Sequence, residues 1–204
     1  MLFYDSVGPN PRVVRVFAAE RGVELAKKTI DLRGGENRRP EYMAKNPMGQ
    51  MPALELDDGT VITEITAICE YLDETAPGGT SLIGANATER AQTRMWTRRI
   101  DLNILEPLTQ GFRYAEGLKL FQPRIHVIPQ AADDLKAIAR KHLAWLDGQL
   151  AGRPFVCGDR LTLADVMLFA FLDFGAQVGQ PVDPALANVT GLLERMKARP
   201  SAKA

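Results

Sequence analysis

Residues 46–52, Asn-Pro-Met-Gly-Gln-Met-Pro, are the most informative stretch of the chain, and the strand-like run Ala53-Leu54-Glu55-Leu56 follows them directly. A proline cannot donate a hydrogen bond to a sheet ladder, so Pro52 belongs at the first residue of a strand, where it is a candidate for a cis bond in a tight turn. We expect a cis Met51–Pro52 bond. It would turn the Met51 backbone outward and leave its N–H and C=O groups free to pair with an extended peptide.

A second informative segment, Thr63-Glu64-Ile65-Thr66, comes seven residues after that strand. It places the Glu64 carboxylate and unpaired backbone N–H groups at the start of a predicted helix. These groups suit the ammonium and the carboxylate of an amino-acid-like ligand. The two segments together predict a cleft for a small zwitterionic peptide.

The segments before this cleft predict a strand, a helix and a second strand. Leu2 to Asp5 is expected to form a short strand, and 11–21 a helix with Asn10 as its N-cap and Pro11 at its first position. Residues 25–32 are expected to form the next strand, which favours a parallel pair with a right-handed crossover. A short helix is expected at 40–45.

The segments after Pro52 predict a hairpin and a helix. Residues 53–56 and 61–63 flank Asp58-Gly59, a pair typical of a tight primed turn. Apolar residues then recur at helical spacing, at positions 65, 68, 69 and 72. The resulting order, βαβαββα, is that of a thioredoxin-like α/β domain.

Breaker residues gather at 77–81, Pro-Gly-Gly-Thr-Ser, and no strand pattern follows them. We therefore expect a first domain at 1–76, a linker at 77–87 and an all-helical domain at 88–204. Its expected helical stretches are 88–118, 129–150, 162–178 and 184–197. Thr162-x-x-Asp165 matches a capping box and is expected to be structural.

Composition narrows the function classes. The 204 residues include 25 basic and 25 acidic side chains, so no net charge favours nucleic acid. The longest apolar run has seven residues, far short of the roughly 20 that span a bilayer. The first residues lack the pattern of a secretory signal, so a cytoplasmic protein is expected.

The metal-ligating side chains are few and scattered. Cys69 and Cys157 are the only cysteines and are expected to be buried, and His126 lies sixteen residues from His142. No metal site is expected.

Residues 46–54 and 63–72 resemble the glutathione site of the cytosolic glutathione transferases, as do the early loop 6–11 and the segment 161–165. The resemblance covers essentially the whole chain. It implies a thioredoxin-like N-terminal domain followed by a helical domain, a homodimer, and a role in detoxification. It also implies glutathione as co-substrate, with its thiolate attacking a small electrophile, a peroxide or a mixed disulfide.

The chemistry requires a group that stabilises the thiolate, because a free thiol with a pKa near 8.5 is only about a few per cent ionised at neutral pH. Gly8 and Pro9 occupy the stretch where many family members place a catalytic Ser or Cys. The resemblance makes Asn10 the first candidate donor to the sulfur, Ser6 the second and Tyr4 the third. For Asn10 a purely capping role is an equal alternative, and the two roles are compatible.

The resemblance also implies residues that bind the rest of glutathione. Glu64 would meet the γ-glutamyl group, and Ile65 would offer only its backbone N–H where many members have Ser, with Thr66 supplying a hydroxyl nearby. Gln50 and Asn37 would reach the glycyl end or belong to surface loops. These join Met51 and Pro52, from the first segment above.

Two alternatives stay open. The aromatic residues Trp96, Phe112, Tyr114 and Phe121 would either line an electrophile pocket or pack in the core. The protein itself could be a non-catalytic binding or scaffold protein that shares the fold, since a fold does not determine a function.

Overall fold

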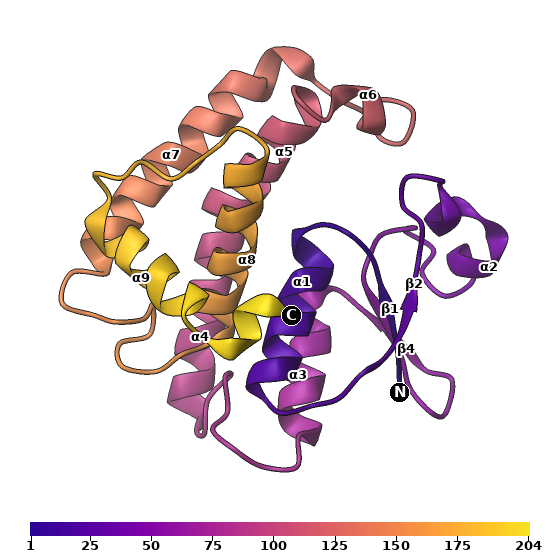
Figure 1. Cartoon of the computed structure of the whole chain (residues 1–204), viewed down its shortest axis with the longest axis horizontal. Coiled ribbons are helices and arrows are strands. Elements are labelled where there is room, and N and C mark those ends of the chain that lie inside the picture. Colours follow the sequence, from indigo (N-terminus) through magenta and orange to yellow (C-terminus); the bar gives the residue numbers. More distant parts are fainter. The chain divides into compact units, whose positions relative to one another are not determined.

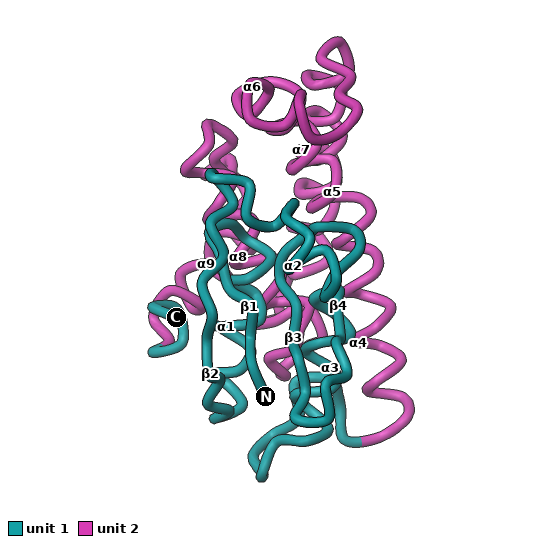
Figure 2. The backbone as a smooth tube through the Cα atoms, turned by 90° about the vertical axis from the view of Figure 1, so that its right-hand side faces the viewer, with its two compact units in different colours: residues 1–85, 200–204 teal, residues 86–199 magenta.

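A computed structural model describes all 204 residues. The chain forms two compact units, residues 1–85 with 200–204, and residues 86–199, coloured separately in Figure 2. Each unit is described below in turn.

The first unit is built on a four-stranded sheet with the strand order β2-β1-β3-β4. The strands are β1 (Leu2–Asp5), β2 (Ala26–Thr29), β3 (Ala53–Glu55) and β4 (Val61–Thr63). β1 runs parallel to β2 and antiparallel to β3, and β3 runs antiparallel to β4. The order βαβαββα is as predicted, and it is the thioredoxin-like arrangement.

Helices cover both faces of this sheet. α1 (Pro9–Glu20) and α3 (Ile65–Thr75) lie on one side, and the short α2 (Pro40–Met43), preceded by the 3-10 turn η1 (Glu36–Arg38), lies on the other (Figure 1). Successive residues of a strand point to opposite faces. Phe3 and Leu54, which lie opposite each other in the sheet, are therefore directed to the α1 and α3 side. The α2 side has its own buried cluster, made by Tyr4, Ile30, Tyr42 and Ala53.

Helix α3 and the bond before β3 confirm their predictions. Ile65, Ile68, Cys69 and Leu72 are all buried along one face of α3. The Met51–Pro52 peptide bond is cis.

The predicted start of α1 is wrong. The helix begins at Pro9 and its N-cap is Gly8, so Asn10 is its second residue and caps nothing. Gly8 has φ 110° and ψ 171°, a conformation open to glycine, and Pro9 at the first helical position has its φ already suited to a helix. The chain therefore enters the helix two residues earlier than a side-chain cap at Asn10 would allow.

The predicted hairpin is confirmed, but its primed turn is wrong. Gly59 has a positive φ of 86° whereas Asp58 does not. The Gly59 N–H donates to the Leu56 carbonyl at 3.0 Å, and the Leu56 N–H donates to the Thr60 carbonyl at 2.8 Å. This is an ordinary turn closed by a glycine bulge. β2 is also shorter than the predicted strand at 25–32.

A buried ion pair secures the segment that follows α3. Arg21 Nε lies 2.8 Å from Asp73 Oδ1, and both side chains are nearly inaccessible. The Arg21 Nε–H is not aligned on the carboxylate, so the attraction is one of charge. Arg21 Nη1 also donates to the carbonyls of Gly78 and Thr80, which holds this segment against the unit.

Residues 200–204 pack on the first unit, although they follow the second unit in the chain. They contain the 3-10 turn η4 (Pro200–Lys203). Arg12 Nη2 donates to the Ala202 carbonyl at 3.3 Å, and the Ser201 hydroxyl donates to the Glu20 carboxylate.

The second unit is helical, as predicted. Its helices are α4 (Ala87–Ile100), α5 (Glu106–Tyr114), α6 (Leu118–Phe121), α7 (Ala132–Gln149), α8 (Leu163–Gln177) and α9 (Ala187–Lys197), with a 3-10 turn η3 (Pro129–Ala131) before α7. α5 packs against α7, and α8 packs against α4 and α9. None of the helices in the structure combines the length and the apolar character needed to cross a membrane.

The predicted single helix at 88–118 is interrupted. A π-helical segment η2 (Asp101–Leu105) joins α4 to α5, and α5 ends at Tyr114. Pro107 lacks an N–H and would clash with the carbonyl of Asn103 in a regular helix. The wider π turn just before it relieves this conflict.

The capping box of α8 is confirmed and is fully buried. Asp165 accepts hydrogen bonds from the Val156 N–H at 2.7 Å, the Thr162 N–H at 2.8 Å and the Thr162 hydroxyl at 2.8 Å. Burial outweighs these donors and raises the pKa of Asp165 to about 6. Cys69 is buried as predicted, whereas Cys157 is only half-buried, so that part of the cysteine prediction is wrong.

Candidate functional site

The loop between β1 and α1 is held by a side chain from the helix that follows it. Arg15 Nη1 donates to Asp5 Oδ1 at 2.5 Å and to the Ser6 carbonyl at 3.3 Å. The Asp5 carboxylate also accepts from the Ser6 N–H at 2.8 Å. This network fixes the path of the chain into Gly8 and the first turn of α1.

The three candidate donors to sulfur differ in whether their hydrogens are free. The Ser6 hydroxyl is buried and donates to the Ile30 carbonyl at 2.7 Å. The Tyr4 hydroxyl donates to Glu55 at 2.5 Å, and burial together with this carboxylate raises the pKa of Tyr4 to about 12. The side chain of Asn10 is half-buried and makes no hydrogen bond within the protein. Of the three, Asn10 alone keeps its donor hydrogens available.

The loop before Pro52 is held by three side chains that converge on its backbone. Tyr42 Oη donates to the Gln50 carbonyl at 2.6 Å, and Asn46 Nδ2 donates to the same oxygen at 2.9 Å. Burial is the main cause that raises the pKa of Tyr42 to about 12, so its hydroxyl keeps the proton that it donates. Asn37 Nδ2 donates to the Gly49 carbonyl at 2.5 Å.

Gly49 lets this loop lie close to the layer beneath it. Its φ is 60°, and a Cβ there would lie 2.9 Å from Met43 Sδ and 3.0 Å from the Asn37 carbonyl. Asn37 itself is buried, with Oδ1 lacking a partner, whereas Gln50 is exposed. Asn37 therefore supports the loop from below, while Gln50 is open to solvent.

Glu64 has the least usual backbone of the chain. It is the one residue other than glycine with a positive φ, at 67°, and it occupies the N-cap position of α3. Such conformations gather at functional sites. No side chain caps α3, so the backbone N–H groups at its start are open to an anion. Ile65 is buried and Thr66 is half-buried beside them.

The register of the sheet brings these parts to one end of the unit. Ala53 lies opposite Tyr4 on β1 and opposite Thr63 on β4. Pro52, which precedes Ala53, and Glu64, which follows Thr63, therefore lie at the same end as the loop that leaves β1. The structure thus groups the predicted residues of both segments with the start of α1.

Three residues support this site although the sequence reasoning gave them no such role: Arg15, Tyr42 and Asn46. Each acts on loop backbone, a contact that leaves no periodic pattern. Only Asn46 carried a signal, because Asn before Pro often starts a turn, and its Oδ1 accepts from the Met48 N–H at 3.1 Å. The chain has no group of three or more side chains placed to hold a metal ion.

Comparisons with known proteins agree with this geometry. Residues 7–75 match the family model for the glutathione S-transferase N-terminal domain, and residues 129–200 match that for its C-terminal domain. Glutathione S-transferase 2 of Saccharomyces cerevisiae is 36% identical, over 100% of this chain and 88% of its own. Glutathione S-transferase GstA of Escherichia coli O157:H7 is 31% identical, over 87% of this chain and 80% of its own.

A solved structure shows the same likeness in three dimensions. The crystal structure of Gtt2 from Saccharomyces cerevisiae superposes with a TM-score of 0.92 at 34% identity, over 100% of this chain and 99% of that one. The family models, the relatives and the fold therefore agree, and the chain belongs to the glutathione S-transferase family.

Proposed function

We propose that this protein is a glutathione transferase: it binds glutathione at the end of the sheet and promotes attack of the thiolate on an electrophilic atom. A sulfur–carbon bond forms, and the leaving group departs with its electron pair. The observation that carries the proposal is the grouping of a Met51 backbone without hydrogen bonds, Glu64 and the uncapped start of α3 beside the start of α1.

Each part of glutathione has a partner in this proposal. The N–H and C=O of Met51, placed by Pro52, pair with the cysteinyl backbone. Glu64 binds the γ-glutamyl ammonium, while the N–H groups of Ile65 and Thr66, with the Thr66 hydroxyl, bind the γ-glutamyl carboxylate.

The glycyl end and the sulfur have partners from other loops. Gln50, which is exposed, is the proposed contact of the glycyl end, and Asn37 supports it from below. The proposed activator of the thiol is the amide of Asn10, aided by the first N–H groups of α1, because both favour an anion without adding charge. Ser6 and Tyr4 are weaker candidates, since each already donates its hydroxyl hydrogen elsewhere.

Calorimetric titration with glutathione, together with turnover of 1-chloro-2,4-dinitrobenzene, tests the proposal. Glu64→Ala should weaken binding strongly, whereas Glu74→Ala, at an exposed position near the other end of α3, should leave it unchanged. Equal affinity in both variants would remove Glu64 from the site. If the unaltered protein neither binds glutathione nor turns over this compound or a hydroperoxide, a scaffold role replaces the enzyme.

The same assays address the type of reaction. We propose transfer to a carbon electrophile as the main activity, with reduction of a hydroperoxide or a mixed disulfide as the alternative reaction at the same thiolate. Turnover of cumene hydroperoxide without turnover of the aryl halide would reverse this order.

We further propose a homodimer. Six large apolar side chains of the second unit are exposed: Met95, Leu102, Leu120, Ile128, Ile138 and Trp145. A C2 contact buries the apolar side chains of its interface on both subunits at once. Light scattering should give twice 22.5 kDa, and a monomer mass over a wide concentration range would refute the dimer.

The family resemblance supports the remaining proposals. Residues 1–76 form the glutathione-binding domain, 77–87 the linker and 88–204 the helical domain. The protein acts on small electrophiles in detoxification, in the cytoplasm, and cell fractionation with exposure of a deletion strain to electrophiles tests both statements.

A further inference from the structure

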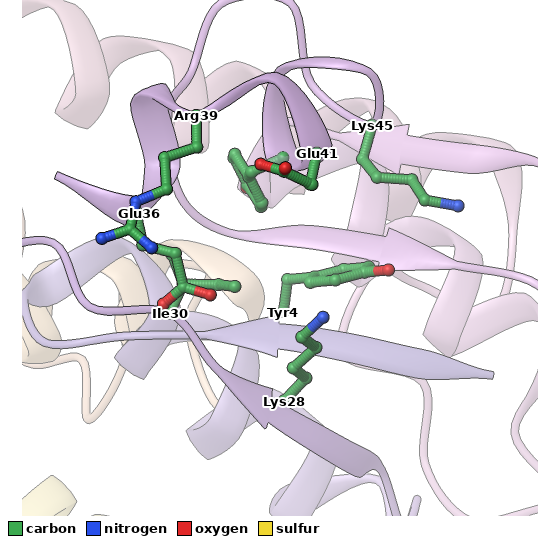
Figure 3. A pocket seen from close by; sticks show the side chains of 8 residues that line it. Tyr4, Lys28, Ile30, Glu36, Arg39, Glu41 and Lys45 are labelled. Carbon is green, nitrogen blue, oxygen red and sulfur yellow. The ribbon is translucent and has the colours of Figure 1, made fainter.

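A pocket of about 440 Å³ lies in the first unit, on the α2 side of the sheet (Figure 3). Its floor is made by Tyr4, Ile30 and Tyr42, and charged side chains from β2 and from residues 36–45 surround it. Apart from Tyr4, none of the residues proposed to contact glutathione lines it.

The floor of the pocket suits an aromatic ring. Tyr4 and Tyr42 are 5% and 3% exposed, and their rings pack edge to face with centroids 5.8 Å apart. Only the edges of these two rings are open to the pocket, and they can meet a third ring in an edge contact, which contributes beyond the area that it buries. Ile30, whose side chain has no polar atom, completes this apolar floor.

Two of the surrounding cations, Lys28 and Arg39, form no ion pair within the protein, although Lys28 attracts the Glu55 carboxylate from a distance. Lys45 Nζ is paired with Glu55 at 2.5 Å, and Glu55 lies outside the lining. Lys28 Nζ lies 5.8 Å from the centre of the Tyr4 ring and forms no salt bridge. The Arg39 guanidinium has no hydrogen bond or ion pair. In Figure 3, Lys28 lies beside the Tyr4 ring and Arg39 reaches down the opposite side.

The lining also holds two carboxylates, Glu36 and Glu41. Glu36 already accepts from the Asp31 N–H at 2.8 Å, which leaves Glu41 as the carboxylate without a hydrogen bond. We propose that this pocket binds a small aromatic carboxylate, with its ring on the two tyrosines. Its carboxylate pairs with the Arg39 fork, and Lys28 adds attraction across the pocket.

The occupant is coupled to the loop before Pro52 through Tyr42. The ring of Tyr42 lines the pocket, while its hydroxyl donates to the Gln50 carbonyl at 2.6 Å. Met51 packs against the same cluster. A ligand that fixes the Tyr42 ring therefore favours the loop conformation that receives glutathione, and the two ligands strengthen each other's binding by the same factor. This coupling rests on the proposed function.

Calorimetric titration of the whole protein with 2-naphthoate, without glutathione, tests the pocket. Arg39→Gln and Lys28→Gln should each weaken binding about threefold or more, as for a partly screened ion pair. Glu41→Gln should strengthen it, because a repelling charge is removed. Lys27→Gln is the matched control: it neighbours Lys28 on β2 but points to the other face and should change nothing. Absence of binding at millimolar 2-naphthoate, or equal affinity in all four variants, would overturn the pocket.

A second titration, with glutathione in the presence and absence of saturating 2-naphthoate, tests the coupling. Glutathione should bind more tightly when 2-naphthoate is present. In Tyr42→Phe the ring remains and the hydroxyl is lost, so 2-naphthoate should still bind but no longer affect glutathione. Unchanged glutathione affinity in the unaltered protein would overturn the coupling. If no glutathione binds at all, the proposed function fails, while the first titration still decides the pocket.

Discussion

The buried carboxyl of Asp165 should make the stability of the protein depend on pH. Its pKa is raised from 3.8 to about 6 in the folded protein. Below pH 3.8 the carboxyl is protonated in both the folded and the unfolded state, and its contribution to stability is fully present. As the pH rises towards and through 6 the unfolded state gives up its proton first, so that contribution is lost. The difference between the two pKa values corresponds to about 3 kcal/mol.

Asp165→Asn isolates this effect, because asparagine does not titrate in this range and keeps one oxygen for the Val156 or Thr162 N–H. We expect the unfolding free energy of the unaltered protein, minus that of the variant, to fall by about 2 kcal/mol between pH 4.5 and pH 7.5. Urea unfolding followed by the fluorescence of Trp96 and Trp145 measures it, and other titrating groups cancel in the difference.

A second variant, Asp165→Ala, measures the hydrogen bonds when it is compared with Asp165→Asn, because neither variant titrates. Asp165→Ala leaves the N–H groups of Val156 and Thr162 buried without acceptors, which costs about 1–3 kcal/mol for each.

A difference in unfolding free energy between the unaltered protein and Asp165→Asn that stays constant from pH 4.5 to pH 7.5 would refute the reasoning. It would mean that the three hydrogen bonds, and not burial, determine the charge of Asp165.

Three further predictions concern the first unit. Asn10→Asp should raise the pKa of the bound glutathione thiol by like-charge repulsion, while its charge in the first turn of α1 stabilises the helix by about 0.3–1 kcal/mol; an unchanged thiolate absorbance titration would contradict this. The free energy of unfolding of Glu64→Gly should be about 1 kcal/mol higher than that of Glu64→Ala, because glycine adopts a positive φ without strain. Both variants should bind glutathione weakly. Equal melting temperatures would show that the Glu64 backbone is unstrained. Asp73→Asn should cost about 3–5 kcal/mol in urea unfolding, since it leaves the buried Arg21 charge unpaired, and a loss below about 1 kcal/mol would show that the pair stabilises little.

The elements that could be predicted from the sequence are those specified by local pattern. The apolar spacing of α3 and the turn residues of the β3–β4 hairpin each depend on residues close in the chain. The predicted start of α1 was wrong because N-cap residues usually carry a side chain that accepts a hydrogen bond, which favours Asn10. In the structure the N-cap is Gly8, and its backbone conformation alone leads the chain into the helix. The π segment before Pro107 could not be predicted from local pattern, because it depends on how a long helix accommodates a residue without a backbone N–H.

The site divides in the same way. Met51, Pro52 and Glu64 lie in short segments that resemble those of a known family, so they could be proposed from the sequence. Arg15 and Tyr42 could not, because each donates to a single loop carbonyl, of Ser6 and of Gln50, and such a contact has no regular spacing in the sequence. The pocket beside Tyr42 could not be predicted from the sequence at all, since residues from β1, β2 and α2, which are far apart in the chain, line it.

The packing of residues 200–204 on the first unit has a consequence for how the protein is made. A ribosome completes the strands and helices of that unit long before it adds these residues, because all of residues 86–199 are translated in between. The nascent unit must therefore wait for the contacts of Arg12 and Glu20 with Ala202 and Ser201. A protein released early, before residues 200–204 are added, would leave the first unit incomplete even though its own strands are all present.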